Sequence, residues 1–362
     1  MISNVICNSA KQGLIPQREY FDKDIANSDN TNGYYIIESN DFVYNPRKSA
    51  DARYGPISSY QYPEAGIVSP LYLCFRAKRE INPLYFEWYF RSSTWHRYIY
   101  MSGDSGARHD RVSIKDDVFF AMPINVPSAK EQERISLFLD AIERRIETQR
   151  TLVETLKKYK RGLLNKLFSN INSNIYPTVY LSEVADFLQG LTYSPSDVSV
   201  SGYLVLRSSN IQNGMLSFDD CVYVDKKVDE SLQVKCDDVI MCVRNGSKNL
   251  VGKTALIPPN MPMTTWGAFM MIIRSKLNDT YIFHYLNSQM FFSQVFKDTG
   301  TATINQITKG ILNECRLPLP PETERKQISK MLSSFDAKIQ NAEKCLATLV
   351  NLKKALLQQL FI

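Results

Sequence analysis

Two long stretches of the chain carry apolar residues at steps of three and four. Such steps, sustained over about nine turns, predict a long amphipathic helix with a coiled-coil seam. Each stretch follows prolines, in MPINVP and LPLPP, and contains none inside, which favours a defined helix start. The first stripe is Ile135, Leu139, Ile142, Ile146, Val153, Leu156, Leu163 and Leu167, and the second is Ile328, Leu332, Phe335, Ile339, Leu346, Leu349, Leu356 and Leu360.

The two stretches are copies of one another. Residues 127–168 realign on residues 320–361 without a gap, so that Leu139 matches Leu332 and Phe168 matches Phe361. A match of this length indicates an internal duplication. We expect the helices to bury their stripes against each other as an antiparallel coiled coil with pseudo-twofold symmetry. A parallel pair, and helices that dimerise with other chains, are the alternatives. The expected pairing residues are Ile135, Leu139, Ile142, Ile146, Leu156, Leu163, Ile328, Leu332, Phe335, Ile339, Leu349 and Leu356.

The regions before each helix are rich in Tyr, Phe, Val, Asn, Gly and Pro. Short apolar runs predict strands, among them YYIIES and DFVYN in the first region and DDVIMCVR and FMMIIRS in the second. Each region continues with an aromatic helix, at residues 82–100 and 279–296, and then a small polar loop. We therefore predict an α+β fold with two globular domains of mixed strands and helices. The expected boundaries are a domain at 1–125, a helix at 126–170, a domain at 176–319 and a helix at 320–362.

Composition narrows the classes of protein to consider. The formal net charge of +6 permits an anionic partner without requiring one. Seven cysteines without any C-x-x-C favour a reducing compartment and argue against a disulfide framework or a structural zinc site. No apolar run approaches the roughly 18 residues that span a bilayer, so we expect a cytoplasmic protein without membrane contact.

Basic and amide side chains recur at strand ends and in glycine-containing loops of both regions. Arginine, asparagine and glutamine pair with base edges, whereas lysine, serine and threonine more often bind phosphates. For a single residue, a solvated loop charge is the simpler interpretation; recurrence at equivalent places favours DNA binding. The predicted DNA-binding residues are Arg47, Lys48, Arg53, Arg108, Arg111, Arg207, Asn210, Arg244, Asn245, Lys248, Thr301 and Asn305.

The sequence shows no catalytic constellation. It has no Walker loop, no G-x-G fingerprint and no H-E-x-x-H, and its three histidines lack metal-ligand spacing. We expect His96 and His284 to pack inside the aromatic helices, and Asp41 and Asp238 to share a turn or cap role. We therefore predict no catalytic residue, no metal ligand and no cofactor in this chain.

Taken together, the order of segments resembles the specificity (S) subunit of type I restriction-modification enzymes over nearly the whole chain. The stretches that carry the resemblance are LSEVADFLQG from Leu181, INVPSAKEQERISLFLDAIERRI, and TGTATINQITKG leading to LPLPPETERKQISKML. It implies a non-catalytic DNA-binding subunit with two target recognition domains, each reading one half of an interrupted target. The helices would set the gap and dock two methyltransferase (M) subunits that use S-adenosylmethionine. Restriction (R) subunits using ATP and magnesium would join them.

One departure concerns the first region. With Asp41 matched to Asp238, it lacks a counterpart of the opening segment LSEVADFLQG of the second region. We expect its fold to start differently, a strand to be missing, or the chain to descend from a recombined or truncated gene. The alternative function is an assembly scaffold that does not bind DNA, such as a silent or truncated copy of a specificity subunit.

Overall fold

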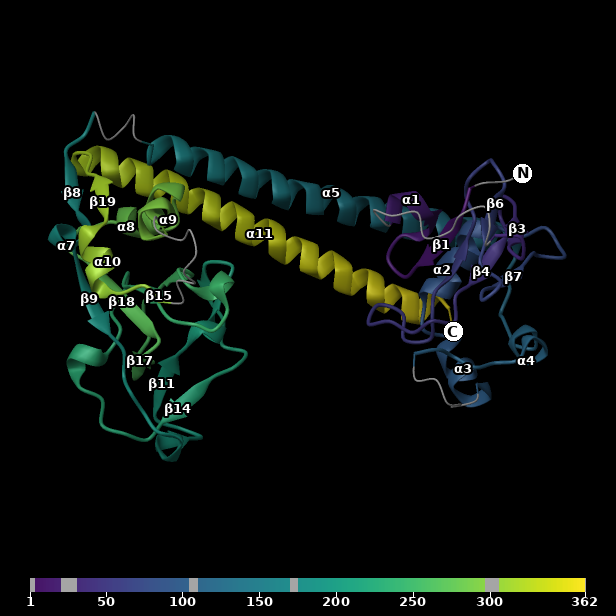
Figure 1. The fold of residues 1–362 in the computed structure, drawn as a ribbon, viewed down its shortest axis with the longest axis horizontal. Coiled ribbons are helices and arrows are strands. Elements are labelled where there is room, and N and C mark those ends of the chain that lie inside the picture. The colour runs from purple at the N-terminus through teal and green to yellow at the C-terminus, as the bar shows by residue number, and fades with distance from the viewer. Residues whose placement is uncertain (1–3, 21–30, 104–109, 170–174, 297–305, 362) are drawn as a thin grey trace. The chain divides into compact units, whose positions relative to one another are not determined.

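The chain folds into two compact units, shown in Figure 1 from a computed structural model. The structure describes residues 4–20, 31–103, 110–169, 175–296 and 306–361. The first unit contains Met1–Arg150 with Lys344–Ile362, and the second contains Thr151–Glu343. Each unit therefore combines one globular region with part of both long helices.

Both long helices form where the apolar stripes predict them. Helix α5 runs over Ala129–Leu167 and helix α11 over Glu322–Leu360, 39 residues each. The hydroxyl of Ser128 accepts a hydrogen bond from the Glu131 amide at 3.3 Å and so caps the start of α5. All the residues predicted to pair are buried or partly buried, and Leu139 and Leu332 are completely so.

Ion pairs between α5 and α11 show that the helices run antiparallel, side by side in Figure 1. In the first unit Lys353 pairs with Glu143 at 2.6 Å, and in the second Lys160 pairs with Asp336. A later position on α5, Lys160 rather than Glu143, thus faces an earlier position on α11, Asp336 rather than Lys353. The repeat relates Lys160 to Lys353 and Glu143 to Asp336, so the two ion pairs are equivalent. The prediction of an antiparallel pair is confirmed.

The second unit is built on two four-stranded sheets. The first has the order β16 (Thr254–Leu256), β15 (Val239–Cys242), β18 (Met270–Ser275) and β9 (Ala185–Gln189), with antiparallel neighbours. Every residue of β15 is buried, as its unbroken apolar run VIMC leads one to expect. The other sheet has the order β10 (Val198–Ser199), β14 (Val222–Val224), β11 (Tyr203–Leu206) and β17 (Thr264–Trp266), and its β11–β17 pair is parallel.

Shorter elements complete the second unit. Strands β8 (Thr178–Tyr180) and β19 (Arg316–Pro318) pair, as do β12 (Ile211–Gln212) and β13 (Met215–Leu216). The helices are α7 (Leu181–Val184), α8 (Tyr281–Leu286), α9 (Gln289–Val295) and α10 (Lys309–Glu314). Short 3-10 helices span Pro195–Asp197, Ser208–Asn210, Glu230–Leu232 and Lys248–Leu250. One apolar core joins α8, α9 and one face of the β15–β18 sheet to both long helices.

The first unit repeats the centre of this architecture. Strand β4 (Phe42–Tyr44) lies between β5 (Ile57–Ser59) and β7 (Leu73–Phe75), as β15 lies between β16 and β18. Strand β3 (Tyr35–Ile37) pairs with β6 (Gly66–Val68), and β1 (Ile6–Ser9) with β2 (Gly13–Pro16). Within the residues described, the β4 sheet has three strands against four in the second unit. The helices are α1 (Gln17–Tyr20), α2 (Pro83–Arg91), α3 (His96–Ser102) and α4 (Asp116–Phe120).

Each predicted aromatic helix is in fact two short helices, α2 with α3 and α8 with α9. The break falls at Ser92 in the first unit and Ser288 in the second, both buried. Each serine hydroxyl donates a 2.6 Å hydrogen bond to a carbonyl oxygen three residues earlier, on Tyr89 and Tyr285 respectively. Because a side chain takes the place of the next backbone bond, the helix ends there. The prediction of one continuous aromatic helix in each region is therefore wrong.

Asp238 holds the turn before β15, as predicted. Its carboxylate accepts the Lys235 amide at 2.8 Å and two hydrogen bonds from the Arg274 guanidinium, at 2.8 and 2.7 Å. In the first unit Asp41 makes the same contacts before β4, with Arg76 at 2.5 and 2.8 Å. Both aspartates are buried, so each turn is fastened to a neighbouring strand by a bidentate ion pair.

No helix in the described part of the chain is long and apolar enough to cross a bilayer. Those same ranges contain no group of histidine, cysteine, aspartate and glutamate side chains that could hold a metal ion.

The seam between the helices should depend on Leu332, which is fully buried. We expect Leu332→Ala to lower the free energy of unfolding by about 2–5 kcal/mol, because it removes apolar contacts and leaves a cavity. The neighbouring Met331→Ala is the matched control: Met331 is 37% exposed, and we expect a change within about 0.5 kcal/mol. Urea unfolding followed by circular dichroism measures both. Equal midpoints would contradict the described seam.

Candidate nucleic-acid interface

Three residues of the second unit meet just beyond the end of β15. The backbone of Arg244 forms an antiparallel bridge with Gln306, and its amide donates to the Phe269 carbonyl at 3.2 Å. The Arg244 guanidinium lies over the Phe269 ring, 5.4 Å from its centroid. Phe269 is 60% exposed, although it is a large apolar side chain. We call Arg244, Phe269 and Gln306 the Arg244 corner.

The Arg244 corner lines a shallow cavity of about 430 Å³. Lys309 adds a second cation to its wall, Thr308 a hydroxyl and Gln189 a second amide. Among the described residues, no aspartate or glutamate lines this cavity. A concave surface with two cations, two amides and one exposed ring suits an anionic ligand with flat polar edges.

The first unit has a matching set of residues beyond the end of β4. Arg47 forms an antiparallel bridge with Arg111, as Arg244 does with Gln306, and the Tyr72 side chain lines the same cavity. We call Arg47, Tyr72 and Arg111 the Arg47 corner. It lines a cavity of about 950 Å³ together with Lys48.

The Arg47 cavity is also positively charged. Asp51 is the one carboxylate among the described lining residues, and it lies 3.5 Å from the ammonium of Lys11, so Arg47, Lys48 and Arg111 add positive charge that no described lining carboxylate offsets. Burial raises the pKa of the Tyr72 hydroxyl, so this group stays protonated and can donate a hydrogen bond at neutral pH.

The arginines of the two corners differ from Arg207 in their pairing. Arg47, Arg111 and Arg244 form no ion pair with any carboxylate in the described ranges. Arg207, which was also predicted to bind DNA, is instead paired with Asp220 at 2.8 Å. A guanidinium without a carboxylate partner has its donors free for a phosphate or a base edge.

Asn210 is not a surface residue, and its predicted role in DNA binding is wrong. It is fully buried, and its amide nitrogen donates to the carbonyl oxygens of Ser217 and Asp220, both at 3.0 Å. Its side-chain oxygen accepts the Arg207 amide at 2.9 Å. Asn210 therefore closes a turn. The sequence could not separate this role from base contact, because asparagine serves both.

The other predicted residues lie in several places. The Asn245 side chain donates to Ser208 at 3.2 Å and accepts the Ser247 amide at 2.9 Å, so it shapes the loop after Arg244. Arg53 lies over the ring of Tyr54 and does not line the Arg47 cavity. Arg108, Thr301 and Asn305, and the side chain of Lys248, are outside the described residues.

Sequence reasoning missed Phe269, Tyr72 and Gln306. Phe269 and Tyr72 stand at the edge of apolar runs, and the sequence alone counts them with the strands that follow. The sequence offers no further signal for these residues, because only strand pairing brings them beside Arg244 and Arg47.

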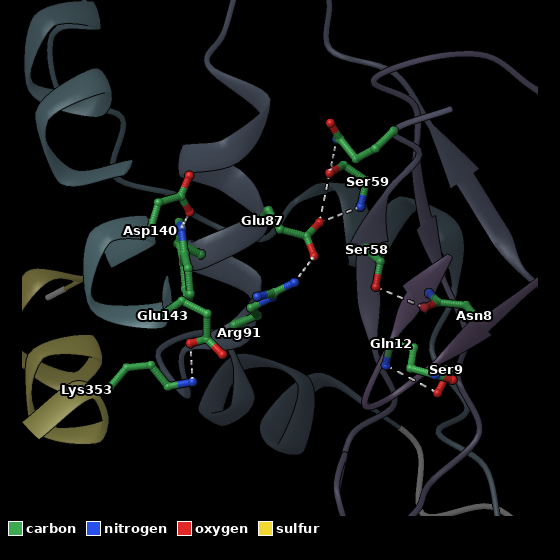
Figure 2. A network of polar contacts seen from close by, with 12 residues as sticks. Asn8, Ser9, Gln12, Ser58, Ser59, Glu87, Arg91, Asp140, Glu143 and Lys353 are labelled. Atoms are coloured by element: carbon green, nitrogen blue, oxygen red, sulfur yellow. Dashed lines mark hydrogen bonds and ion pairs between the residues drawn. The ribbon is translucent and has the colours of Figure 1, made fainter. Parts of the chain in front are cut away.

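A line of polar contacts fixes the first globular region to the long helices (Figure 2). The Glu87 carboxylate accepts the backbone amide and hydroxyl of Ser59, at 2.6 and 2.8 Å, which joins α2 to β5. On the other side of α2, the Trp88 indole donates to Asp140 of α5 at 2.8 Å. The sheet that carries the Arg47 corner is thereby held on the helix.

In the second unit His284 occupies the place of Trp88. Its ring Nε2 lies 3.2 Å from the hydroxyl of Ser333, the repeat equivalent of Asp140. His284 is completely buried, as predicted. His96 is only partly buried, and its ring makes an edge-to-face contact with Trp95. Burial, with a smaller contribution from the charge of Lys160, lowers the pKa of His284 to about 3. The imidazole is therefore neutral at pH 7.

The low pKa of His284 predicts a loss of stability in acid. The unfolded chain binds a proton at about pH 6.5, whereas the folded chain does so only near its pKa of about 3, so acidification favours the unfolded state. We expect this residue to contribute a loss of about 1.4 kcal/mol for each pH unit below about 6. His284→Gln should remove that contribution. Urea unfolding of both proteins between pH 7 and 4 tests it; parallel stability curves would contradict a buried neutral histidine.

Comparison with known proteins supports the sequence resemblance. Residues 176–350 match the model of the family described as the type I restriction modification DNA specificity domain. The specificity subunit of the type I restriction enzyme EcoKI of Escherichia coli (strain K12) is 28% identical over 171 residues, which cover 45% of this chain and 36% of that protein. The StySPI specificity subunit of Salmonella potsdam is 28% identical over 176 residues, 46% of this chain and 38% of that protein. The chain therefore matches well under half the length of these relatives.

Solved structures share the fold over most of the chain. The type I restriction-modification S subunit from M. genitalium is 16% identical, covers 94% of this chain and 87% of its own, and gives a TM-score of 0.53. A chain from a structural study of assembly and conformational transition of the type I R-M system is 19% identical, with 90% and 82% coverage and a TM-score of 0.56. These likenesses confirm the predicted α+β fold with long helices. The family match over residues 176–350 and the similar specificity subunits bear out the resemblance drawn from the sequence.

Proposed function

We propose that this chain is the sequence-specific DNA-binding specificity subunit of a type I restriction-modification system. Each unit reads one half of an interrupted target. The observation that carries the proposal is the recurrence of two facing polar side chains beyond an equivalent strand end in both units, Arg244 with Gln306 and Arg47 with Arg111. Recurrence on two diverged units argues against an accidental cluster of loop charges.

The chemistry of the corners suits duplex DNA. Arginine can bind guanine through two hydrogen bonds in the major groove, and glutamine can bind adenine in the same manner. Lys48 and Lys309 line the same cavities and are placed to contact phosphates, which fix the register of the protein without reading sequence. Each unit thus offers both kinds of contact that specific binding needs.

The long helices would set the gap between the two half-sites. A 39-residue helix is about 58 Å long at 1.5 Å per residue, which exceeds one turn of B-DNA, about 34–36 Å. Lengthening both helices in phase would therefore lengthen the gap.

The same helices would dock methyltransferase subunits. Outside the paired seam, α5 exposes Phe138, Leu152 and Tyr159, which are 49%, 45% and 59% exposed. Phe138 and Leu152 lie fourteen residues apart, and Leu152 and Tyr159 lie seven apart, so the three share one face of the helix. Such a second apolar stripe suits helices from partner subunits, which we take to be two M subunits.

The chemistry of the complex would reside in its partners. We infer that the M subunits bind S-adenosylmethionine and methylate adenine, and that restriction (R) subunits use ATP and magnesium for cleavage. In this proposal the chain itself is not an enzyme, and it works in the cytoplasm, where the target DNA is. The isolated chain should neither transfer methyl groups nor cleave DNA.

Arg244→Ala tests the two-word reading. The chain is expressed with its M subunit in a host without other adenine methylation, and the methylome gives both half-sites and the gap. We expect Arg244→Ala to relax specificity at one base pair of one half-site, at a cost of about 1–3 kcal/mol in binding, while the other half-site is unchanged. Lys276→Ala is the control, because this substitution removes the same charge at a different place. Lys276 follows the end of β18, whereas Phe269 precedes its start.

Direct binding separates the proposal from a scaffold that does not bind DNA. A mobility shift whose affinity falls steeply with salt is expected for a protein that neutralises phosphates. Absence of any shift at low salt, even with the M subunit present, would leave the scaffold as the better explanation. Equal loss of both half-sites in Arg244→Ala would contradict the assignment of one word to each unit.

A further inference from the structure

We propose that Phe269 and Gln306 read bases together with Arg244, with Arg244 on a guanine and Gln306 on an adenine of the neighbouring base pair. The equivalent pair in the first unit, Arg47 and Arg111, would then read two neighbouring guanines. This inference rests on the proposed function and names the chemistry of the two words.

The backbone bridge between Arg244 and Gln306 places their side chains together. Residues paired in an antiparallel ladder point to the same face, with Cβ atoms about 4.5–5.5 Å apart. Stacked base pairs are about 3.4 Å apart along one strand, so two long side chains with this spacing can reach neighbouring base pairs. Both residues are exposed and line the same cavity.

The position of Gln306 is set by the backbone and not by its own side chain. The Ile307 amide donates to the Val243 carbonyl at 2.7 Å, which ties the segment after Gln306 to the end of β15. In the first unit the Val112 amide donates to the Pro46 carbonyl at 2.9 Å in the same way. Gln306 and Arg111 can therefore replace one another without loss of this tie.

Phe269 has two roles in this geometry. The Arg244 guanidinium lies over its ring, with the guanidinium carbon 5.4 Å from the ring centroid, and this contact limits the directions in which the guanidinium can point. Phe269 is 60% exposed, so its ring also presents an apolar surface beside the polar side chains of Arg244 and Gln306. The thymine methyl group is the apolar feature of the major groove, and it lies on the pair that Gln306 would read through adenine.

The two corners differ in chemistry while they agree in place. Arg111 stands where Gln306 stands, whereas the strand register puts Leu71, which is 58% exposed, where Phe269 stands. Arg111 has a guanidinium, which can bind guanine, where Gln306 has an amide, which can bind adenine. The two units would thus read different words with one geometry.

A single substitution tests this directly. Gln306→Arg gives the second corner the polar pair of the first, and Gln306→Ala removes the amide reader. The methylome of cells carrying each variant with the M subunit is compared with that of the original chain. We expect Gln306→Arg to change one base pair of one half-site from A·T to G·C, and Gln306→Ala to relax the same position by about 5- to 150-fold, with the other half-site unchanged.

Phe269→Ala tests the ring, with Phe218→Ala as its control because Phe218 is 49% exposed in the same unit and does not line the cavity. We expect weaker preference at the two base pairs of this corner for Phe269→Ala and no change for Phe218→Ala. Thermal melting of each purified variant checks that it folds.

The outcomes separate the inference from the proposed function. If the original chain directs methylation to a two-part site but the Gln306 and Phe269 variants keep that site unaltered, the base-reading role is overturned and the proposed function stands. If the original chain directs no site-specific methylation, the proposed function itself fails. A change in both half-sites would also overturn the assignment.

Discussion

The burial of one phenylalanine at the end of each long helix is the contact on which both units depend. Phe168 ends the α5 segment and packs on Tyr281 and Tyr285 of α8, with ring centroids 5.1 and 5.8 Å apart. Phe361 follows α11 and packs on the equivalent tyrosines of α2, Tyr85 and Tyr89, with ring centroids 5.4 and 5.8 Å apart. A helix that leaves one globular region therefore ends in the core of the other. Neither globular region can be removed without exposing an aromatic cluster, because each core is completed by the other copy of the repeat.

This constraint explains which residues the duplication kept. Asp41 with Arg76, and Asp238 with Arg274, are ion pairs in which the aspartate is buried, so loss of the arginine would leave an uncompensated buried charge. Such pairs can change only together, so they persist in both units. The side chains of the two corners carry no comparable obligation, because their positions come from backbone hydrogen bonds. The ion pairs of buried aspartates therefore constrain the fold of each unit, whereas the exposed side chains of the two corners can be substituted.

The sequence was most informative where a periodic or local rule applied. Heptad steps predicted both helices and their seam, and the equivalent places of Asp41 and Asp238 predicted a shared turn. It failed where one residue type serves two purposes: Asn210 has the chemistry of a base reader but is buried in a turn. It also failed where the signal is three-dimensional. Gln306 lies far from Arg244 along the chain, and only strand pairing brings them together, whereas Phe269 is unusual solely because it is exposed.

The geometry of the corners has a consequence for how such a protein changes its specificity. A reader on a flexible loop would have to reorganise the loop for each new base contact, and the cost of ordering it would fall on binding. Here the proposed reader Arg244 follows β15 directly, and its backbone is already hydrogen-bonded to Phe269 and bridged to Gln306. A substitution at Arg111 or Gln306 alters donors and acceptors but not their placement. New words can then arise by single side-chain changes on an unchanged frame, as the differences between the two units of this chain already illustrate.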